Sequence, residues 1–591
     1  MLIRHSTIFL LLAPERKENY MTSNIFSNLK KELDTARKLP LTLIGSLAFF
    51  IASFSLVIYY ICCPSVGFWH SDCTDSLYWA NATVESGMII ADNYRYAAIL
   101  PFSANLWMIP IIKMFGFTVK SQIISMVIFA VLYVLSQIWL FRSLKMTWPL
   151  TLTATGIMLM VLSSSTKMRE IMWEHVIYYS LAILVFNCLL ALFLNAVHAW
   201  EKYRDSGRDR YMVLALLFTV ILALLSLGTS TNGFSIIIMT TAPVFIGIAA
   251  EMMFENKKKL LTDENSGRIF AAACIPVFTV VGLKVLDILK GDIEADYTNY
   301  YSKFAPIKNW TENLFKFPSH FLTLIGFTDD TAELAEKAGI NNLIALCIFI
   351  VLTLTPFIAL LFYNKFKFRE TRVAILSYLA LFGMIMLVFV CGNISNVNWR
   401  ITPIVGISMI PLFAIVNELF EYYRDNKKEC DEKKCVKSSV PFRLAVVIIL
   451  LFTVFSFKNY KEISEFPADY GRDNTVHQLT NVLKENGLEY GFATFWRSQA
   501  ITLLSDNEIK CREILTTTYD GAKTDYYQSS YDWYDPQEGV EEYFVLLSED
   551  EYNKVKNHPN WISWTENQLI RKIEYNYFLI FVFDGYIEGI K

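Results

Sequence analysis

Charge of either sign is scarce in this sequence. Only 18% of its 591 residues are charged, and the formal net charge is -3. Proteins that bind nucleic acid carry a basic patch or stripe, so we expect no nucleic-acid partner. The ten cysteines are scattered and include no CxxC pair, so the sequence does not support a disulfide framework, although Cys62, Cys63 and Cys73 are near enough in sequence for one disulfide. The seven histidines are not grouped with the cysteines along the chain, so we assign no metal-binding residues.

Apolar residues are abundant instead. They make up 54% of the chain, aromatic residues make up 15%, and the mean hydropathy is +0.35. Apolar runs of about 18 residues or more recur, and each is long enough to cross a bilayer as a helix. Backbone polar groups in lipid must be satisfied within the segment, which favours helices over open strands. The sequence therefore predicts a polytopic α-helical membrane protein with about eleven transmembrane helices, at residues 41–61, 121–141, 149–165, 176–198, 211–228, 234–253, 269–286, 343–363, 373–391, 401–420 and 443–457.

The placement of Lys and Arg predicts the orientation. These residues crowd the segment 1–40 and every second loop after it, and such loops usually stay in the cytoplasm. We therefore expect a cytoplasmic N-terminus and an extracytoplasmic C-terminus. The apolar stretch 97–116 contains Pro101 and Pro110 and would invert this pattern if it crossed the membrane. We expect it to be a re-entrant or interfacial helix.

Three regions follow from these observations. Residues 1–40 form a cytoplasmic segment, in which the apolar run 1–12 lacks the cleavage site of a signal peptide. Residues 41–457 form the transmembrane domain, with outer loops at 62–120 and 289–342. Residues 458–591 form a small extracytoplasmic α/β domain, because helical and strand patterns alternate there. Its expected elements are a helix at 475–486 and strands at 490–496, 543–547 and 577–583.

Two acids stand out in the first outer loop. Asp72 and Asp75 are three residues apart, so in a helix they share one face, just after the first transmembrane segment. A carboxylate at such a position can act as a general base toward an acceptor hydroxyl. The alternative is a solvated polar loop without chemistry.

Two further outer loops carry candidate substrate-binding residues. Arg400 precedes a predicted helix and has Pro403 three residues on, which places a guanidinium at the headgroup layer. Such a group either clamps a phosphate or snorkels to the interface. In the second outer loop, Arg169 is a candidate phosphate contact, while Glu174 and His175 are candidate acceptor contacts. A loop with local ion pairs is the alternative there.

This layout resembles the GT-C superfamily of polytopic membrane glycosyltransferases, which use polyprenyl-phosphate-linked sugars at the outer membrane face. The resemblance rests on Asp72 and Asp75 after the first helix, the proline-bearing stretch 100–116, and the late Arg400 before a spanning helix and an outer domain. It implies that Asp72 or Asp75 is the catalytic base and that Arg400 contacts the donor phosphate. The commonest Asp-Glu pair of the family is replaced here by Asp-Cys-Thr-Asp.

The function expected from these patterns is inverting transfer of a sugar from a polyprenyl-phosphate-linked donor to a cell-envelope glycan, lipid or protein. A transporter or flippase of lipid-linked saccharides is the main alternative, and a polymerase of such saccharides or a scaffold whose outer domain binds a partner is another. A flippase predicts paired broken helices related by internal symmetry, and the sequence shows none. No cofactor is assigned, although two carboxylates suit a weakly held divalent metal ion.

Overall fold

A computed structural model describes residues 41–175, 177–255, 265–293, 295, 303–328, 333, 336–427, 432–587 and 589–590, without the side chains of 427–438. The expected cytoplasmic segment 1–40 lies outside these residues. In the described part, ten helices are long and apolar enough to cross a membrane, or eleven if a bent pair counts as one span. The protein is thus a multi-span membrane protein. The spans are α2 (Leu41–Cys62), α5 (Val119–Ser143), α8 (Tyr179–Ser206), α9 (Asp209–Ser230), α10 (Phe234–Met239) with α11 (Thr241–Glu255), α12 (Ser266–Lys290), α15 (Lys337–Leu361), α16 (Arg369–Cys391), α17 (Thr402–Lys427) and α18 (Glu432–Glu465).

The bent pair corresponds to the predicted span 149–165. Helix α6 (Trp148–Val161) ends early, and the chain turns by 114° into a second helical stretch, Thr166–His175. A serine lies at the break: the Ser165 side chain accepts a hydrogen bond from the Met168 amide and so caps the new helix. The same hydroxyl donates to the Leu324 carbonyl at 2.8 Å. The second stretch therefore lies at the end of the bundle.

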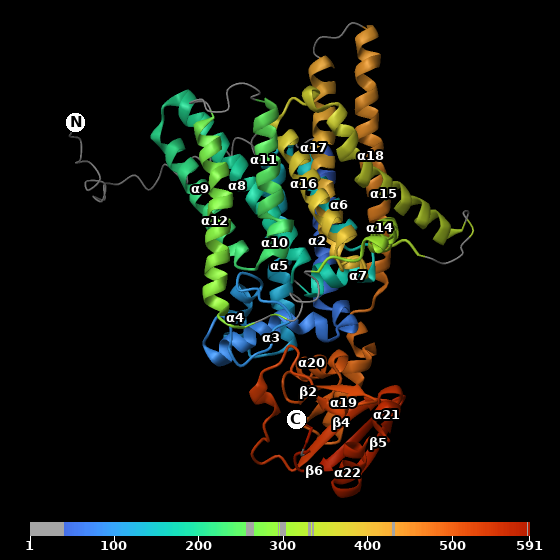
Figure 1. The fold of residues 1–591 in the computed structure, drawn as a ribbon. Helices are drawn as coiled ribbons and strands as arrows, with labels where there is room; N and C mark the ends of the chain where they lie inside the picture. The colour runs from blue at the N-terminus through green and yellow to red at the C-terminus, as the bar shows by residue number, and fades with distance from the viewer. Residues whose placement is uncertain are drawn as a thin grey trace, which may run out of the picture.

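The first loop forms two short helices at that same end. Helix α3 (Ser71–Ser86) starts directly after His70, and α4 (Asn105–Phe115) is the apolar helix in the proline-bearing stretch. With 11 residues, α4 is too short to cross a bilayer by itself, which needs about 20. Figure 1 shows both helices in blue, between the bundle and the C-terminal domain.

The C-terminal region is a small α/β domain built on one mixed sheet. Strands follow the order β3-β2-β1-β4-β6-β5, in which β1 pairs in parallel with β2 and β4 and the other pairs are antiparallel. Both faces of the sheet carry apolar cores, one around Trp561 and Phe581 and one around Leu483 and Phe544. The elements are α19 (Thr475–Glu485), β1 (Tyr490–Ala493), α20 (Phe495–Leu504), β2 (Lys510–Thr517), β3 (Gly521–Thr524), β4 (Glu542–Ser548), α21 (Glu549–Val555), α22 (Pro559–Asn567), β5 (Leu569–Tyr575) and β6 (Phe578–Asp584).

The expected helix and the three expected strands of this domain correspond to α19, β1, β4 and β6. The expected domain boundary at 457–458 lies inside α18, which continues to Glu465. A short linker then brings the domain back onto the first loop. Asn474 caps α19 with its side-chain oxygen, and its amide donates to the Val66 and Trp69 carbonyls at 2.9 and 3.0 Å. Gly67 lies so close to the Tyr470 ring that any Cβ there would collide with it.

Candidate functional site

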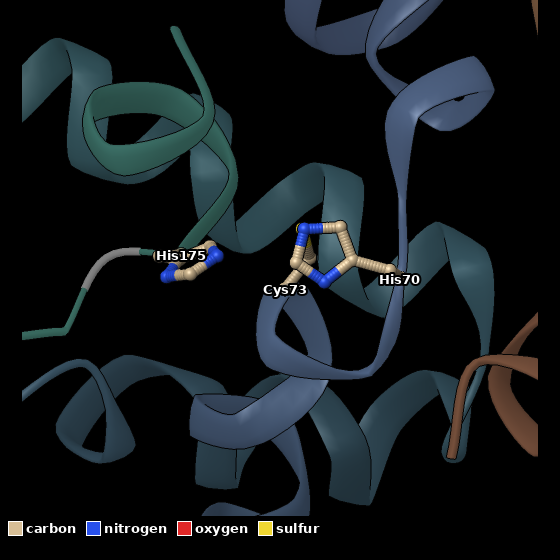
Figure 2. A group of neighbouring side chains, drawn as sticks. All are labelled: His70, Cys73 and His175. Carbon is tan, nitrogen blue, oxygen red and sulfur yellow. The ribbon is translucent and has the colours of Figure 1, made fainter. Parts of the chain in front are cut away.

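The start of α3 meets a second segment, the π-helix η3 (Glu170–His175), at the end of the bundle nearest the C-terminal domain. Figure 2 shows His70 and Cys73 on one segment and His175 on the other, with the side chains turned toward one another. A π-helical turn is rare and is frequently found at functional sites. All six residues of η3 are buried. The polar groups here are therefore held inside the protein.

Glu170 is the hub of an ion-pair cluster. Its Oε1 lies 3.4 Å from His70 Nε2 and 3.2 Å from His175 Nε2, and its Oε2 lies 2.5 Å from Lys167 Nζ. Burial raises the pKa of Glu170, but the imidazoles of His175 and His70 outweigh it and hold that pKa well below its usual value. Burial lowers the pKa of His70, and Glu170 in turn holds it above its usual value. Glu170 thus stays ionised within the cluster.

Glu174, also in η3, is more deeply buried than Glu170. The Tyr60 hydroxyl donates to its Oε1 at 2.6 Å, and the Cys73 thiol lies 3.6 Å from its Oε2. The side chain is fully buried, and burial raises the pKa of Glu174 to about 7. Burial also raises the pKa of the Cys73 thiol. The expected acceptor contacts Glu174 and His175 thus lie beside the start of α3, where Glu174 accepts from Tyr60 and His175 lies at ion-pair distance from Glu170.

The structure corrects the expectation that histidines and cysteines do not gather. One ligand atom each from His70, Cys73 and His175 lies within 4.8 Å of the others. His70 and Cys73 are three residues apart at the start of α3, and this spacing brings two side chains together on one face of a helix. The spacing is visible in the sequence, but sequence reasoning missed it. His175 follows about 100 residues later, so only the fold brings it to the other two. These three residues form a candidate metal centre within the described part of the chain.

Asp72 and Asp75 both lie in α3, as a helical first loop predicts, but their surroundings differ. Asp72 is half-buried in the first turn, and its negative charge acts on His70 and Cys73. Asp75 is 5% exposed, and its Oδ1 has no hydrogen-bond partner among the described residues. Burial raises the pKa of Asp75, the Asp72 charge adds to this, and the Gln528 amide offsets only part. Asp72 thus lies on the side of the histidine cluster, whereas Asp75 lies against the C-terminal domain.

The C-terminal domain covers Asp75 through a buried polar contact. The Trp79 indole donates to Gln528 Oε1 at 2.6 Å, and the Tyr94 hydroxyl donates to the Gln528 carbonyl at 2.5 Å. Gln499 adds a bond to the same carbonyl at 2.9 Å. Gln528 is fully buried and has a φ of 55°, a left-handed backbone that residues other than glycine seldom adopt. The domain is therefore fitted closely to α3.

Arg400 lies at the same end of the bundle, on the short helix η6 (Asn398–Ile401). It is half-buried, and its Nη1 donates to the Asn393 carbonyl at 3.4 Å. The adjacent Trp399 ring lies 4.8 Å from Lys167 Nζ, which connects η6 to the Glu170 cluster. Sequence reasoning missed Lys167, although it precedes the acidic pair of the second loop. Two cationic side chains, Lys167 and Arg400, thus lie on neighbouring segments.

Arg169 has a different environment from the one expected of a phosphate contact. Its side chain is wholly buried, and its Nη2 pairs with Glu462 Oε1 of α18 at 2.8 Å. Its Nη1 donates to the Ser163 carbonyl at 3.0 Å. The guanidinium also lies between the rings of Tyr60 and Phe466. These contacts hold the Thr166–His175 stretch against α18 and leave no exposed guanidinium surface for a ligand.

Comparison with known proteins identifies the fold. The sequence matches no family model and no curated protein. In structure, the chain is similar to ArnT from Cupriavidus metallidurans bound to undecaprenyl phosphate, with a TM-score of 0.51 and 10% identity over 92% of this chain and 99% of ArnT. Apo ArnT gives a TM-score of 0.53 and 11% identity over 91% and 98%. The protein has the GT-C fold. The apo oligosaccharyltransferase of Archaeoglobus fulgidus is less similar, with a TM-score of 0.42 and 11% identity over 85% of this chain and 70% of that one.

The GT-C fold of this chain contains an apolar groove of about 510 Å³ among α4, α5, α8 and α9. Most of the residues that line the groove are apolar. One end of the groove is at Phe102, in the first loop, and this loop also contains α3. An apolar groove open along a bundle suits the chain of a lipid, because lipid and lining are equally apolar. The groove is lined by Phe102, Ser103, Leu106, Trp107, Leu132, Leu135, Ser136, Trp139, Leu181, Leu184, Val185, Cys188 and Leu225.

Proposed function

We propose that the protein transfers a sugar from a polyprenyl-phosphate-linked donor to an acceptor of the cell envelope. One observation carries this proposal: in a GT-C fold, which ArnT displays with undecaprenyl phosphate bound, Asp72 lies half-buried at the end of the bundle beside the ion-pair cluster of Glu170, which includes the cation Lys167. A lipid-linked sugar phosphate needs a base for the acceptor and positive charge for the phosphate. Both are available on α3 and on the segments around it.

Asp72 is the proposed general base, and the reaction is a single inverting displacement. The Asp72 carboxylate takes the proton of an acceptor hydroxyl as the acceptor oxygen bonds to the anomeric carbon. The bond from that carbon to the phosphate oxygen breaks, and polyprenyl phosphate leaves with the electron pair. A positioned base contributes about a hundredfold to ten-thousandfold in rate. Asp75 is buried against the C-terminal domain, which makes it the weaker candidate.

Arg400 and Lys167 are the proposed phosphate contacts. A guanidinium binds phosphate through two parallel hydrogen bonds, and a lysine acts as a point charge beside it. Stabilising the negative charge that develops on the leaving phosphate is the larger part of such catalysis. The polyprenyl chain would lie in the apolar groove, which starts at the loop that carries α3.

The proposed site faces the outside of the cell. The site lies where α2 ends and α3 begins. Helices α5 and α8 start at this end of the bundle and finish at the opposite end, which we call the far end. Basic residues gather in the loops at the far end of the bundle, and loops rich in Lys and Arg usually stay in the cytoplasm. The C-terminal domain, which covers the site, would then be extracytoplasmic. The basic residues at the far end are Arg142, Lys145, Lys202, Arg204, Arg208, Arg210, Arg268, Lys365, Lys367, Arg369 and Arg372.

The test is release of polyprenyl phosphate from labelled donors. The purified full-length protein is reconstituted in liposomes with a panel of labelled polyprenyl-phosphate hexoses and pentoses and with an isolated cell-envelope fraction. We expect at least one donor to lose its sugar to that fraction. Asp72→Asn should reduce the rate by about a hundredfold or more, with little change in donor KM. Transport of intact donor across the liposome without sugar release would contradict the proposal.

Two matched variants distinguish the base from its neighbours. Asp75→Asn keeps the shape of a buried side chain beside Gln528 and should retain activity within a few fold. Asp92→Asn changes an exposed acid of the same loop and should leave the rate unchanged. Full activity in Asp72→Asn, or a loss in Asp75→Asn that matches it, would remove Asp72 as the base.

A further inference from the structure

We propose that His70, Cys73 and His175 bind a zinc-class transition metal ion that joins the start of α3 to η3. Two imidazoles and one thiolate are ligands that Zn²⁺ prefers, and three protein ligands leave one position open for water or a substrate atom. The three side chains come from two segments that meet only in the folded protein (Figure 2). This inference concerns metal binding and does not depend on the proposed glycosyl transfer.

The geometry requires only a small adjustment. The three ligand atoms lie within 4.8 Å of one another. Tetrahedral coordination, with bonds of about 2.0 Å to nitrogen and 2.3 Å to sulfur, places two nitrogens and one sulfur roughly 3.3 to 3.5 Å apart. Closing the difference takes about 1 Å. The His70 side chain, which is 26% exposed, has the freedom to make that shift, while Cys73 is fully buried and fixed in the first turn of α3.

Carboxylates surround the three ligands as they do in known metal sites. A ligating histidine usually bonds through its other nitrogen to a carboxylate, which fixes the ring and raises its basicity. Glu170 lies within ion-pair distance of both His70 and His175, and Glu174 lies 3.6 Å from the Cys73 sulfur. These acids also supply negative charge, which favours a bound cation in a dry site.

Unsatisfied nitrogens at the same place support a missing partner. His70 Nδ1 and His175 Nε2 are both buried, and neither has a hydrogen bond within the described residues. His175 Nε2 lies 3.2 Å from Glu170, which is close enough for an ion pair but outside hydrogen-bond geometry. Buried polar atoms are nearly always paired, so two such nitrogens in one cluster call for an explanation. A metal ion on His70 Nδ1 would satisfy that nitrogen and leave the Nε2 of the same ring for Glu170.

The first test uses the unaltered full-length protein in detergent. After removal of metal with a chelator, it is titrated with Zn²⁺ and, separately, with Co²⁺. We expect one ion per chain, competition between the two metals, and the charge-transfer absorption of a Co²⁺–thiolate bond. Folded protein that binds no Co²⁺, or binds it without the thiolate band, would overturn the proposal. The second result would place any ion on carboxylates such as Asp72 instead.

Variants then locate the site. Cys73→Ser should abolish the thiolate band, whereas Cys511→Ser, a control that changes an equally buried cysteine of the C-terminal domain, should keep it. Cys430 and the side chain of Cys435 lie outside the described part of the chain and are present in both variants, so a band that survives Cys73→Ser would overturn the assignment. Glu170→Gln should weaken Zn²⁺ binding by about tenfold to a hundredfold, because it removes the carboxylate behind both rings.

The histidines need their own comparison. His175→Gln should lower the affinity for Zn²⁺ by more than Glu170→Gln does, since it removes a ligand and not its support. His320→Gln is the control, because the His320 ring is half-buried and its Nε2 lies 2.9 Å from the Ser395 carbonyl, away from the cluster. Equal Zn²⁺ affinity in the wild type and His175→Gln would overturn the proposal. Loss of sugar transfer with intact metal binding would instead bear on the proposed function alone.

Discussion

Glu513 shows how strongly one buried residue can respond to its surroundings. It lies on β2, is 3% exposed, and its Oε2 has no hydrogen-bond partner within the described residues. Burial, and then the charges of Asp525 and Asp75, raise the pKa of Glu513 to about 10 from an ordinary 4.5. A folded pKa above the unfolded one gives stability that is complete below pH 4.5 and is lost as pH rises toward 10. At pH 8 the Glu513 carboxyl group is ionised in the unfolded chain but protonated in the folded protein.

Glu513→Gln should therefore stabilise the protein at high pH. The amide resembles the protonated acid in shape but cannot ionise in the unfolded chain. We expect a higher Tm at pH 8, equivalent to about 1 to 3 kcal/mol, and no gain near pH 4.5. Thermal unfolding of the detergent-solubilised protein at both pH values measures this. Glu541→Gln, at an exposed position of the same domain, is the control and should change Tm at neither pH. A gain that is equal at both pH values would contradict the ionisation argument.

The sequence could identify the acids of α3 but not their different roles. Asp72 and Asp75 have equivalent positions in a helical pattern, and only the C-terminal domain, which arrives some 450 residues later, buries Asp75. The same holds for the candidate metal centre. His70 and Cys73 are visible as a local pair, whereas the third member, His175, follows only about 100 residues later in the sequence. A π-helical turn sets which residues of the second segment face α3, and no simple periodicity predicts that turn.

At the scale of elements, apolar length predicts the bundle well. Helix α2 coincides with its predicted span to within one residue, and α16 starts four residues before its predicted start at 373. Strand β5 is not predicted from the sequence because Arg571, Lys572 and Glu574 dilute its apolar pattern, although half-buried and exposed positions alternate along it. The bend after α6 could not be predicted from the sequence either, because a run of serines is equally typical of the end of a transmembrane helix. Local composition thus predicts where helices run but not where they turn.

The contact between α7 (Thr166–Arg169) and α18 gives a prediction about elements. Arg169 is wholly buried, and its carboxylate partner Glu462 is 38% exposed. Glu462→Ala would leave a buried guanidinium without its counter-charge, which should cost about 1 to 3 kcal/mol, less than in a fully buried pair because solvent screens the exposed carboxylate. We expect a clearly lower Tm, since the stretch that carries η3 depends on this pair.

Glu465→Ala is the matched control for that variant. Glu465 is on the same helix, but its pair with Lys461 is exposed on both sides, and such pairs contribute under about 1 kcal/mol. Its Tm should stay close to that of the wild type. If Glu462→Ala left Tm unchanged and raised the donor KM instead, Arg169 would act on substrate rather than on the fold.

At the scale of the whole molecule, the proposed orientation puts the C-terminal domain outside the cell. A membrane-impermeant thiol reagent applied to intact cells tests it. Glu566→Cys places a thiol on an exposed position of α22, and it should be labelled above the wild-type background. Arg208→Cys, exposed at the far end of the bundle, should be labelled only after the cells are opened. The opposite pattern would place the α3 site in the cytoplasm and contradict the outer-face reaction.

The C-terminal domain and the bundle are coupled most directly at Gln528. Its side chain accepts from the Trp79 indole of α3, and its carbonyl accepts from Tyr94 of the same loop. Gln528→Ala removes the acceptor and leaves the buried indole N–H unpaired, which costs about 1 to 3 kcal/mol. We expect faster amide hydrogen exchange across α3 and slower sugar transfer, because α3 carries the proposed base. Gln537→Ala changes a side chain whose bond is local, to the Asp535 carbonyl, and should leave α3 exchange unchanged. Unchanged exchange in Gln528→Ala would mean that the bundle alone, and not the docked domain, holds α3 in place.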